Sequence, residues 1–61
     1  MIFKFNMGEV VQIVCSGEVG QIVARAEYVS GNRQYLLRYK AGDGRAVEAW
    51  WDQEAVGYYA A

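Results

Sequence analysis

Short alternating segments separated by glycine-containing turns constrain the fold of this chain more than any other feature. Four segments are rich in β-branched, aromatic or alternating apolar residues: 9–14, 21–29, 34–40 and 46–51. Successive side chains of a strand point to opposite faces of a sheet, so this pattern is typical of half-buried β-strands. Glycine lies in each of the intervening stretches, 15–20, 30–32 and 41–45, and proline is absent. The pattern predicts an all-β protein with tight turns.

The end of the chain differs from the segments before it. In 52–56, Asp52 can cap a single 3₁₀-like turn, after which Val56 can return to the core. Residues 57–61 are expected to form a short final strand or a tail, and residues 1–6 a flexible or edge-strand tail. We therefore expect residues 1–61 to form a single domain, a small barrel of four to five short antiparallel strands with a 3₁₀ turn before the last strand.

An amphipathic helix is the competing prediction for residues 19–29. Alanine, arginine and glutamate in this stretch favour a helix. The flanking glycines Gly17, Gly20 and Gly31 and the β-branched residues favour a strand instead. We expect the strand.

The small size of the chain raises the question of what stabilises it. A domain of this length buries only about 60% of the surface of its unfolded chain. Cys15 is the only cysteine and histidine is absent, so neither an intrachain disulfide nor a zinc site of the usual kind is available. Because 54% of the residues are hydrophobic, we expect self-association into a dimer or tetramer, and we expect no cofactor or metal.

Charge and composition also separate the candidate function classes. The absence of histidine removes the commonest general base, so we expect a binding module rather than an enzyme, with no catalytic residues. A net charge of −1 argues against a nucleic-acid-binding protein, which is normally basic. No apolar run approaches the roughly 20 residues that span a bilayer, and "MIFKFNMG" lacks the features of a signal peptide. We expect a cytoplasmic protein without membrane contact.

Two adjacent tryptophans, Trp50 and Trp51, are the main candidates for a functional role. If 46–51 is a strand, their rings point to opposite faces. Glu48 shares the face of Trp50, and an unpaired carboxylate is costly to bury. We therefore expect Trp50 outside and Trp51 in the core. Two alternatives stay open: a bulge that turns Trp50 inward, or a tail that folds over it.

Other residues on the predicted outer faces complete a candidate interaction surface. Apolar side chains lie near its centre and charged side chains around it, as is typical of an interface. We expect this surface to serve self-association or the binding of a host protein. Its members are Trp50, Glu48, Leu36, Val23, Arg38 and Arg25.

The remaining aromatic and basic residues have two interpretations each. Tyr28, Tyr35 and Tyr39 are expected in the core with their hydroxyls at its rim; the alternative is an aromatic groove for a peptide. Cys15 is expected to be a small apolar filler. The basic side chains are expected on solvated strand faces; the alternative is a basic strip that binds nucleic acid weakly. These side chains are Arg25, Arg33, Arg38, Lys40 and Arg45.

The order of these elements resembles SH3-like barrels over about residues 7–56. The resemblance rests on "MGEVVQIVCSGEVGQIV", the Tyr-rich strand, the Gly-containing hairpin and the final turn. More narrowly, "YLLRYKAGDGRAVEAWW" is similar to small uncharacterised proteins of bacteriophages and prophages. This resemblance implies a phage or mobile-element origin and no particular activity.

The chain also resembles the plasmid-borne type II dihydrofolate reductase, in "FNMGEVV", "SGEVGQIV" and "AVEAW". That resemblance implies an alternative function as an NADPH-dependent enzyme that acts as a homotetramer. The family lines its active pore with a Val-Gln-Ile-Tyr stretch and uses a lysine before its Ser-Gly turn. In this chain 47–50 is "VEAW", with Glu48 in place of glutamine, and Val14 or Cys15 stands in place of the lysine.

We expect no measurable NADPH-dependent reduction of dihydrofolate by this chain. Glu48 would repel the anionic phosphates and carboxylate of the ligands, and the lysine is missing. If activity is latent, Glu48→Gln is the substitution expected to reveal it. The decrease of NADPH absorbance measures the rate, and a steady wild-type rate that is lost when Trp50 is replaced would contradict this expectation.

Overall fold

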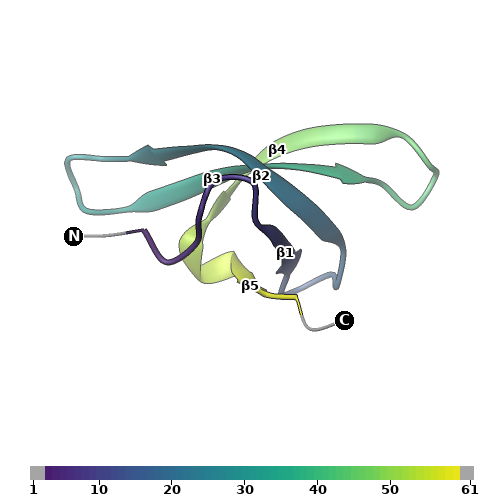
Figure 1. Ribbon diagram of the computed structural model, residues 1–61, viewed down its shortest axis with the longest axis horizontal. Helices are drawn as coiled ribbons and strands as arrows, with labels where there is room; N and C mark the ends of the chain where they lie inside the picture. The colour runs from purple at the N-terminus through teal and green to yellow at the C-terminus, as the bar shows by residue number, and fades with distance from the viewer. Residues whose placement is uncertain (1–2, 60–61) are drawn as a thin grey trace.

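A computed structural model describes residues 3–59 of the chain (Figure 1). It contains five strands and one short 3₁₀ helix: β1 (Val10–Ile13), β2 (Val19–Glu27), β3 (Arg33–Lys40), β4 (Ala46–Asp52), η1 (Gln53–Ala55) and β5 (Val56–Tyr58). All neighbouring strands are antiparallel, in the spatial order β4-β3-β2-β1-β5. The expected all-β fold of short antiparallel strands with a 3₁₀ turn before the last strand is confirmed, and residues 19–27 form β2, not the competing helix.

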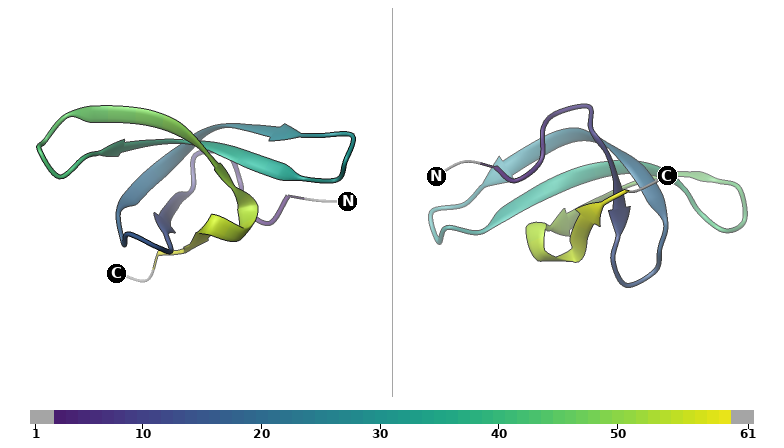
Figure 2. Two further views of the ribbon diagram at one scale, coloured as in Figure 1. Left: turned by 180° about the vertical axis from the view of Figure 1, so that it is seen from behind. Right: turned by 60° about the horizontal axis from the view of Figure 1, so that its bottom comes forward.

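The long strands and the short strands form two parts of the molecule. β2, β3 and β4 make a twisted ribbon, and β1, β5 and the N-terminal segment lie against one side of it (Figures 1 and 2). We call this side of the ribbon the inner face and the opposite side the outer face. The β2–β3 and β3–β4 turns lie at opposite ends of the ribbon (Figure 1), and the molecule is elongated, measuring 36 × 21 × 20 Å.

The core lies between the inner face of the ribbon and the two short strands. Alternation is visible in β1, where Val11 and Ile13 are buried, and in β3, where Tyr35 and Leu37 are buried. Val56 returns to the core directly after η1, as the sequence indicated. The buried apolar residues are Phe5, Val11, Ile13, Ile22, Tyr35, Leu37 and Val56.

The N-terminal segment contributes more than the expected tail, whereas the end of the chain forms the short edge strand that was one of its two expected forms. Phe5 is fully buried, and its ring meets Tyr35 edge-on at a centroid distance of 5.4 Å. At the other end, Gly57 and Tyr58 belong to β5, an edge strand that pairs with β1. Residues 1–2 and 60–61, which were included in the expected tails, lie outside the described residues.

A β-bulge interrupts the pairing of β2 with β3. Ile22 lies opposite Leu37, whereas Ala24 lies opposite Leu36, so Val23 has no partner in β3. A bulge inserts one residue into one strand and therefore reverses the faces of all residues beyond it. The two halves of β2 thus expose opposite sets of side chains.

The bulge corrects the faces predicted for the second half of this strand. Arg25 is opposite the buried Tyr35, so it lies on the inner face with Glu27. Strict alternation through 21–29 predicts that Ala24 and Ala26 share a face with Ile22, but both lie on the outer face instead.

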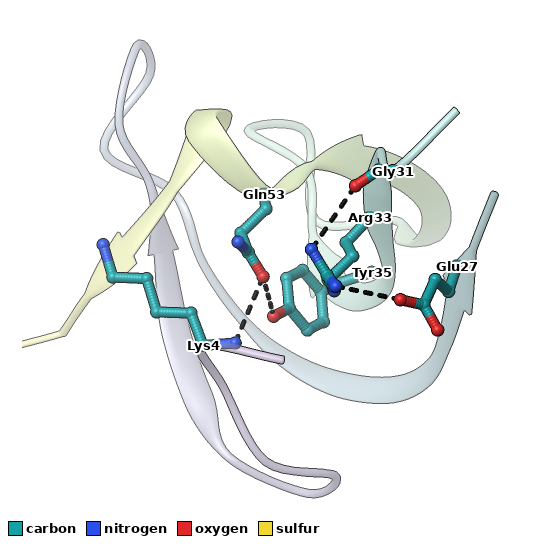
Figure 3. A network of polar contacts seen from close by, with 6 residues as sticks. All are labelled: Lys4, Glu27, Gly31, Arg33, Tyr35 and Gln53. Carbon is teal, nitrogen blue, oxygen red and sulfur yellow. Dashed lines mark hydrogen bonds and ion pairs between the residues drawn. The ribbon is translucent and has the colours of Figure 1, made fainter. Parts of the chain in front are cut away.

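A buried hydroxyl connects three separate parts of the chain (Figure 3). The Tyr35 hydroxyl accepts a hydrogen bond from the backbone N–H of Phe5 at 3.1 Å and donates one to Oε1 of Gln53 at 2.5 Å. Gln53 Oε1 also accepts from the backbone N–H of Lys4 at 3.1 Å. These bonds join the N-terminal segment, β3 and η1, so the polar atom inside the core is satisfied.

Gly20 allows β2 and β3 to approach closely beside this core. A Cβ at this buried position would lie 3.0 Å from the carbonyl oxygen of Arg38 and 3.0 Å from the Cβ of Tyr39. The backbone oxygen cannot move away without disturbing the pairing of the two strands. By contrast, Gly42 in the β3–β4 turn has no atom within 4 Å of such a Cβ.

We therefore expect Gly20→Ala to lower the free energy of unfolding by about 1–3 kcal/mol, the usual cost of overpacking. The control, Gly42→Ala, should change it by no more than about 0.5 kcal/mol, as surface substitutions usually do. Urea denaturation followed by tryptophan fluorescence measures both values. Equal effects of the two substitutions would contradict the close approach at Gly20.

Candidate functional site

An apolar row crosses the outer face of the ribbon. Ala24 in β2 lies opposite Leu36 in β3, and Leu36 lies opposite Trp50 in β4. Residues directly opposite each other in an antiparallel pair share a face and their side chains are in reach. Trp50 is 47% exposed, whereas Leu36 is half-buried. We call Ala24, Leu36 and Trp50 the outer row.

Charged side chains border the outer row on one side. Gln21, Arg38 and Glu48 are aligned across β2, β3 and β4. The guanidinium of Arg38 bonds to Oε2 of Glu48 through both Nε and Nη2, each at 2.7 Å. Both side chains remain well exposed, so this pair adds little to stability but neutralises the surface next to Trp50.

Polar side chains border the outer row on its other side. Ala26, Gln34 and Asp52 are aligned across the same three strands. Gln34 donates from Nε2 to Asp52 Oδ1 at 2.7 Å and accepts at Oε1 from the hydroxyl of Tyr28 at 2.9 Å. Asp52 thus bonds to Gln34, and its side chain makes no capping bond to η1.

The structure brings together four of the six residues predicted for the interaction surface. Trp50 and Leu36 lie in the outer row, and Glu48 and Arg38 form the ion pair beside it. Val23 lies in the bulge, adjacent to the outer row but without a partner in β3.

Arg25 is the residue of that set that lies elsewhere, and the prediction that it borders Trp50 is wrong. Its guanidinium carbon is 4.5 Å from the ring centroid of Phe3, and its Nη1 donates to the carbonyl oxygen of Phe5 at 3.3 Å. The bulge before Ala24 reverses which side chains of β2 face inward, so Arg25 lies on the inner face. Ala24 takes the outer position, and no feature of the sequence marks the bulge.

Several other side chains also differ from their predicted environments. Tyr35 and Tyr39 pack in or against the core as expected, but Tyr28 is exposed. Cys15 is exposed in the turn after β1 rather than filling an apolar space. Arg33 is only 7% exposed and pairs with Glu27 at 2.9 Å, so it belongs to no surface strip (Figure 3).

The β3–β4 hairpin and Trp51 have the conformation and environment that the sequence predicts. Gly44 has φ +90°, the left-handed conformation that the Asp-Gly turn requires. Arg45 is held by Asp43 at 2.8 Å, so part of the basic charge at this turn is already neutralised. Trp51 packs inward against the core and meets Tyr39 edge-on at 6.5 Å.

Residues 3–59 form no pocket and no cluster of three His, Cys, Asp or Glu side chains that could hold a metal ion. Among these residues there is also no helix long and apolar enough to cross a membrane.

No protein-family model, no curated protein and no solved structure matches the chain. The resemblances to phage proteins and to the type II reductase stay expectations, and the surface itself is the guide to function.

The two arginines assigned to one patch by the sequence should have different effects when removed. Arg25→Ala should lower the free energy of unfolding by about 1 kcal/mol, because it removes a cation–π contact and a bond to a backbone carbonyl. Arg38→Ala should lower it by less than about 0.5 kcal/mol, because its ion pair is exposed. Urea denaturation distinguishes them, and a larger loss for Arg38→Ala would contradict the faces assigned here.

Proposed function

We propose that the chain is a non-enzymatic interaction module that self-associates through the surface around Trp50. The observation that carries the proposal is the outer row, in which a half-exposed tryptophan lies beside Leu36, and Leu36 lies beside Ala24. Tryptophan is strongly enriched among residues that dominate binding energies, and it is rarely left on a surface in company with other apolar groups.

The borders of the outer row favour a second copy as the partner. The charges of Arg38 and Glu48 compensate each other within one molecule, and the carboxylate of Asp52 accepts a hydrogen bond from the neutral amide of Gln34. A surface of this kind can approach an identical surface without strong repulsion. An arrangement of apolar centre and polar rim is also the usual anatomy of an interface.

The small core gives self-association a physical advantage. Seven apolar residues are buried in the described part of the chain, which is few for a domain that must offset the conformational entropy of folding. Association buries further apolar surface and stabilises the folded state by mass action. The exposed Trp50 is the largest apolar side chain available for this purpose on the outer face.

Two expectations from the sequence, on the origin and the location of the protein, form part of the proposal. The module would belong to a phage or another mobile element, as its resemblance to phage proteins implies, and it would act in the cytoplasm. A host protein would then be a second partner for the same surface.

We expect the wild type to be a dimer or tetramer at micromolar concentration, and Trp50→Ala to weaken association by about 2 kcal/mol, or roughly 30-fold in the dissociation constant. The substitution removes the largest apolar side chain of the proposed interface, so the association should weaken. Val29→Ser is the matched control, because Val29 is a fully exposed apolar residue at the β2–β3 turn, away from Trp50.

Sedimentation equilibrium over a range of concentrations measures both dissociation constants. A wild type that stays strictly monomeric at high concentration would overturn the proposal. Equal weakening by Val29→Ser and Trp50→Ala would show that the association is non-specific.

A further inference from the structure

β4 is the longer of the two edge strands of the sheet. It pairs with β3 on one side, and no strand among the described residues pairs with its other side. The strand has seven residues, Ala46–Asp52, whereas β5 at the opposite edge has three. It contains neither proline nor lysine, the residues that most often protect an edge from pairing. β4 therefore presents a free row of backbone donors and acceptors.

The β3–β4 turn shows which residues of β4 point these groups outward. The N–H of Ala41 donates to the carbonyl oxygen of Arg45 at 2.8 Å, so hydrogen bonding begins at this pair. Hydrogen-bonded and non-hydrogen-bonded pairs alternate in an antiparallel ladder. Val47, Ala49 and Trp51 therefore bond to β3, whereas the backbone N–H and C=O groups of the alternate residues face the free edge. These residues are Ala46, Glu48, Trp50 and Asp52.

We propose that two copies of the chain pair their β4 strands antiparallel about a two-fold axis at Ala49. The inference rests on the proposed self-association and adds the segment and the register that carry it. Hydrogen bonding between the outward-facing groups of the two strands is possible in three registers near the middle of β4, in which the two-fold axis passes through Glu48, Ala49 or Trp50. The first sets Glu48 against the partner's Glu48, and the last sets Glu48 against the partner's Asp52, so both place like charges directly opposite each other.

The register centred on Ala49 opposes no like charges and uses all seven residues of the strand. On the inner face, Val47 lies opposite the partner's Trp51, and Ala49 opposite the partner's Ala49. This alignment continues the apolar inner face across the junction. On the outer face, Trp50 lies opposite the partner's Glu48, beside the Arg38–Glu48 ion pair of that copy. The pairing therefore involves Trp50 directly and joins the two sheets into one.

Disulfide formation tests this register. In a Cys15→Ser background, which removes the exposed native thiol, single cysteines are introduced by Glu48→Cys, Ala49→Cys and Trp50→Cys. A non-hydrogen-bonded pair has a Cα separation of about 4.5 Å, within the range that a disulfide spans. We expect Ala49→Cys to form a covalent dimer under mild oxidation at least tenfold faster than the other two, with each variant at a concentration that gives the same fraction of non-covalent dimer before oxidation. Equal rates, or a faster reaction at 48 or 50, would overturn the register.

Removal of one outward-facing N–H tests the strand pairing itself. Glu48→Pro and Glu48→Ala both lose the ion pair with Arg38, but only proline removes the N–H that faces the free edge, and proline is tolerated on edge strands. We expect the dimer dissociation constant of Glu48→Pro to exceed that of Glu48→Ala at least tenfold, measured by sedimentation equilibrium, with the β-sheet circular dichroism spectrum retained.

The outcomes separate this inference from the proposed function. A dimeric wild type with equal dissociation constants for Glu48→Pro and Glu48→Ala would overturn the β4 pairing and leave self-association through another part of the surface. A monomeric wild type would overturn both. If Glu48→Pro does not fold, the rates of the three cysteine variants decide the question.

Discussion

The hydroxyl of Tyr35 is the interaction on which the rest of the structure depends. It lies in a fully buried side chain and bonds both to the N-terminal segment, at Phe5, and to η1, at Gln53. The two bonds join Tyr35 to residues 30 and 18 positions away in the sequence, and a buried phenol without partners would be costly. The same residue therefore orders the segment before β1 and positions the turn that leads into β5.

The bulge at Val23 is the second constraint, and it separates stabilising residues from surface residues. Beyond it, Arg25 faces Phe3 on the inner side, so one cation helps to cover the core. Ala24 faces outward in exchange, which leaves Trp50 beside small and aliphatic neighbours instead of a second guanidinium. An apolar outer row next to an open strand edge results, and it is the physical basis for proposing that the chain associates with itself.

The sequence by itself determined the features that depend on neighbouring residues along the chain. Alternation predicted the strands, and the Asp-Gly dipeptide predicted the β3–β4 turn with Gly44 at positive φ. Glu48 lies on the same face of the strand as Trp50, and an unpaired carboxylate is costly to bury. The sequence therefore predicted that Trp50 points outward, as it does. The return of Val56 to the core after a short turn was also predictable, since an apolar residue followed a polar stretch.

Only the tertiary structure decided the features that depend on pairing between distant segments. The bulge arises where β2 meets β3, so the sequence of β2 alone predicted the wrong face for Arg25. Burial of Phe5 needed the Tyr35 hydroxyl as a partner for its N–H, and burial of Arg33 needed the carboxylate of Glu27. A charge or a backbone group is costly to bury without a partner from another segment, and the local sequence pattern does not identify that partner.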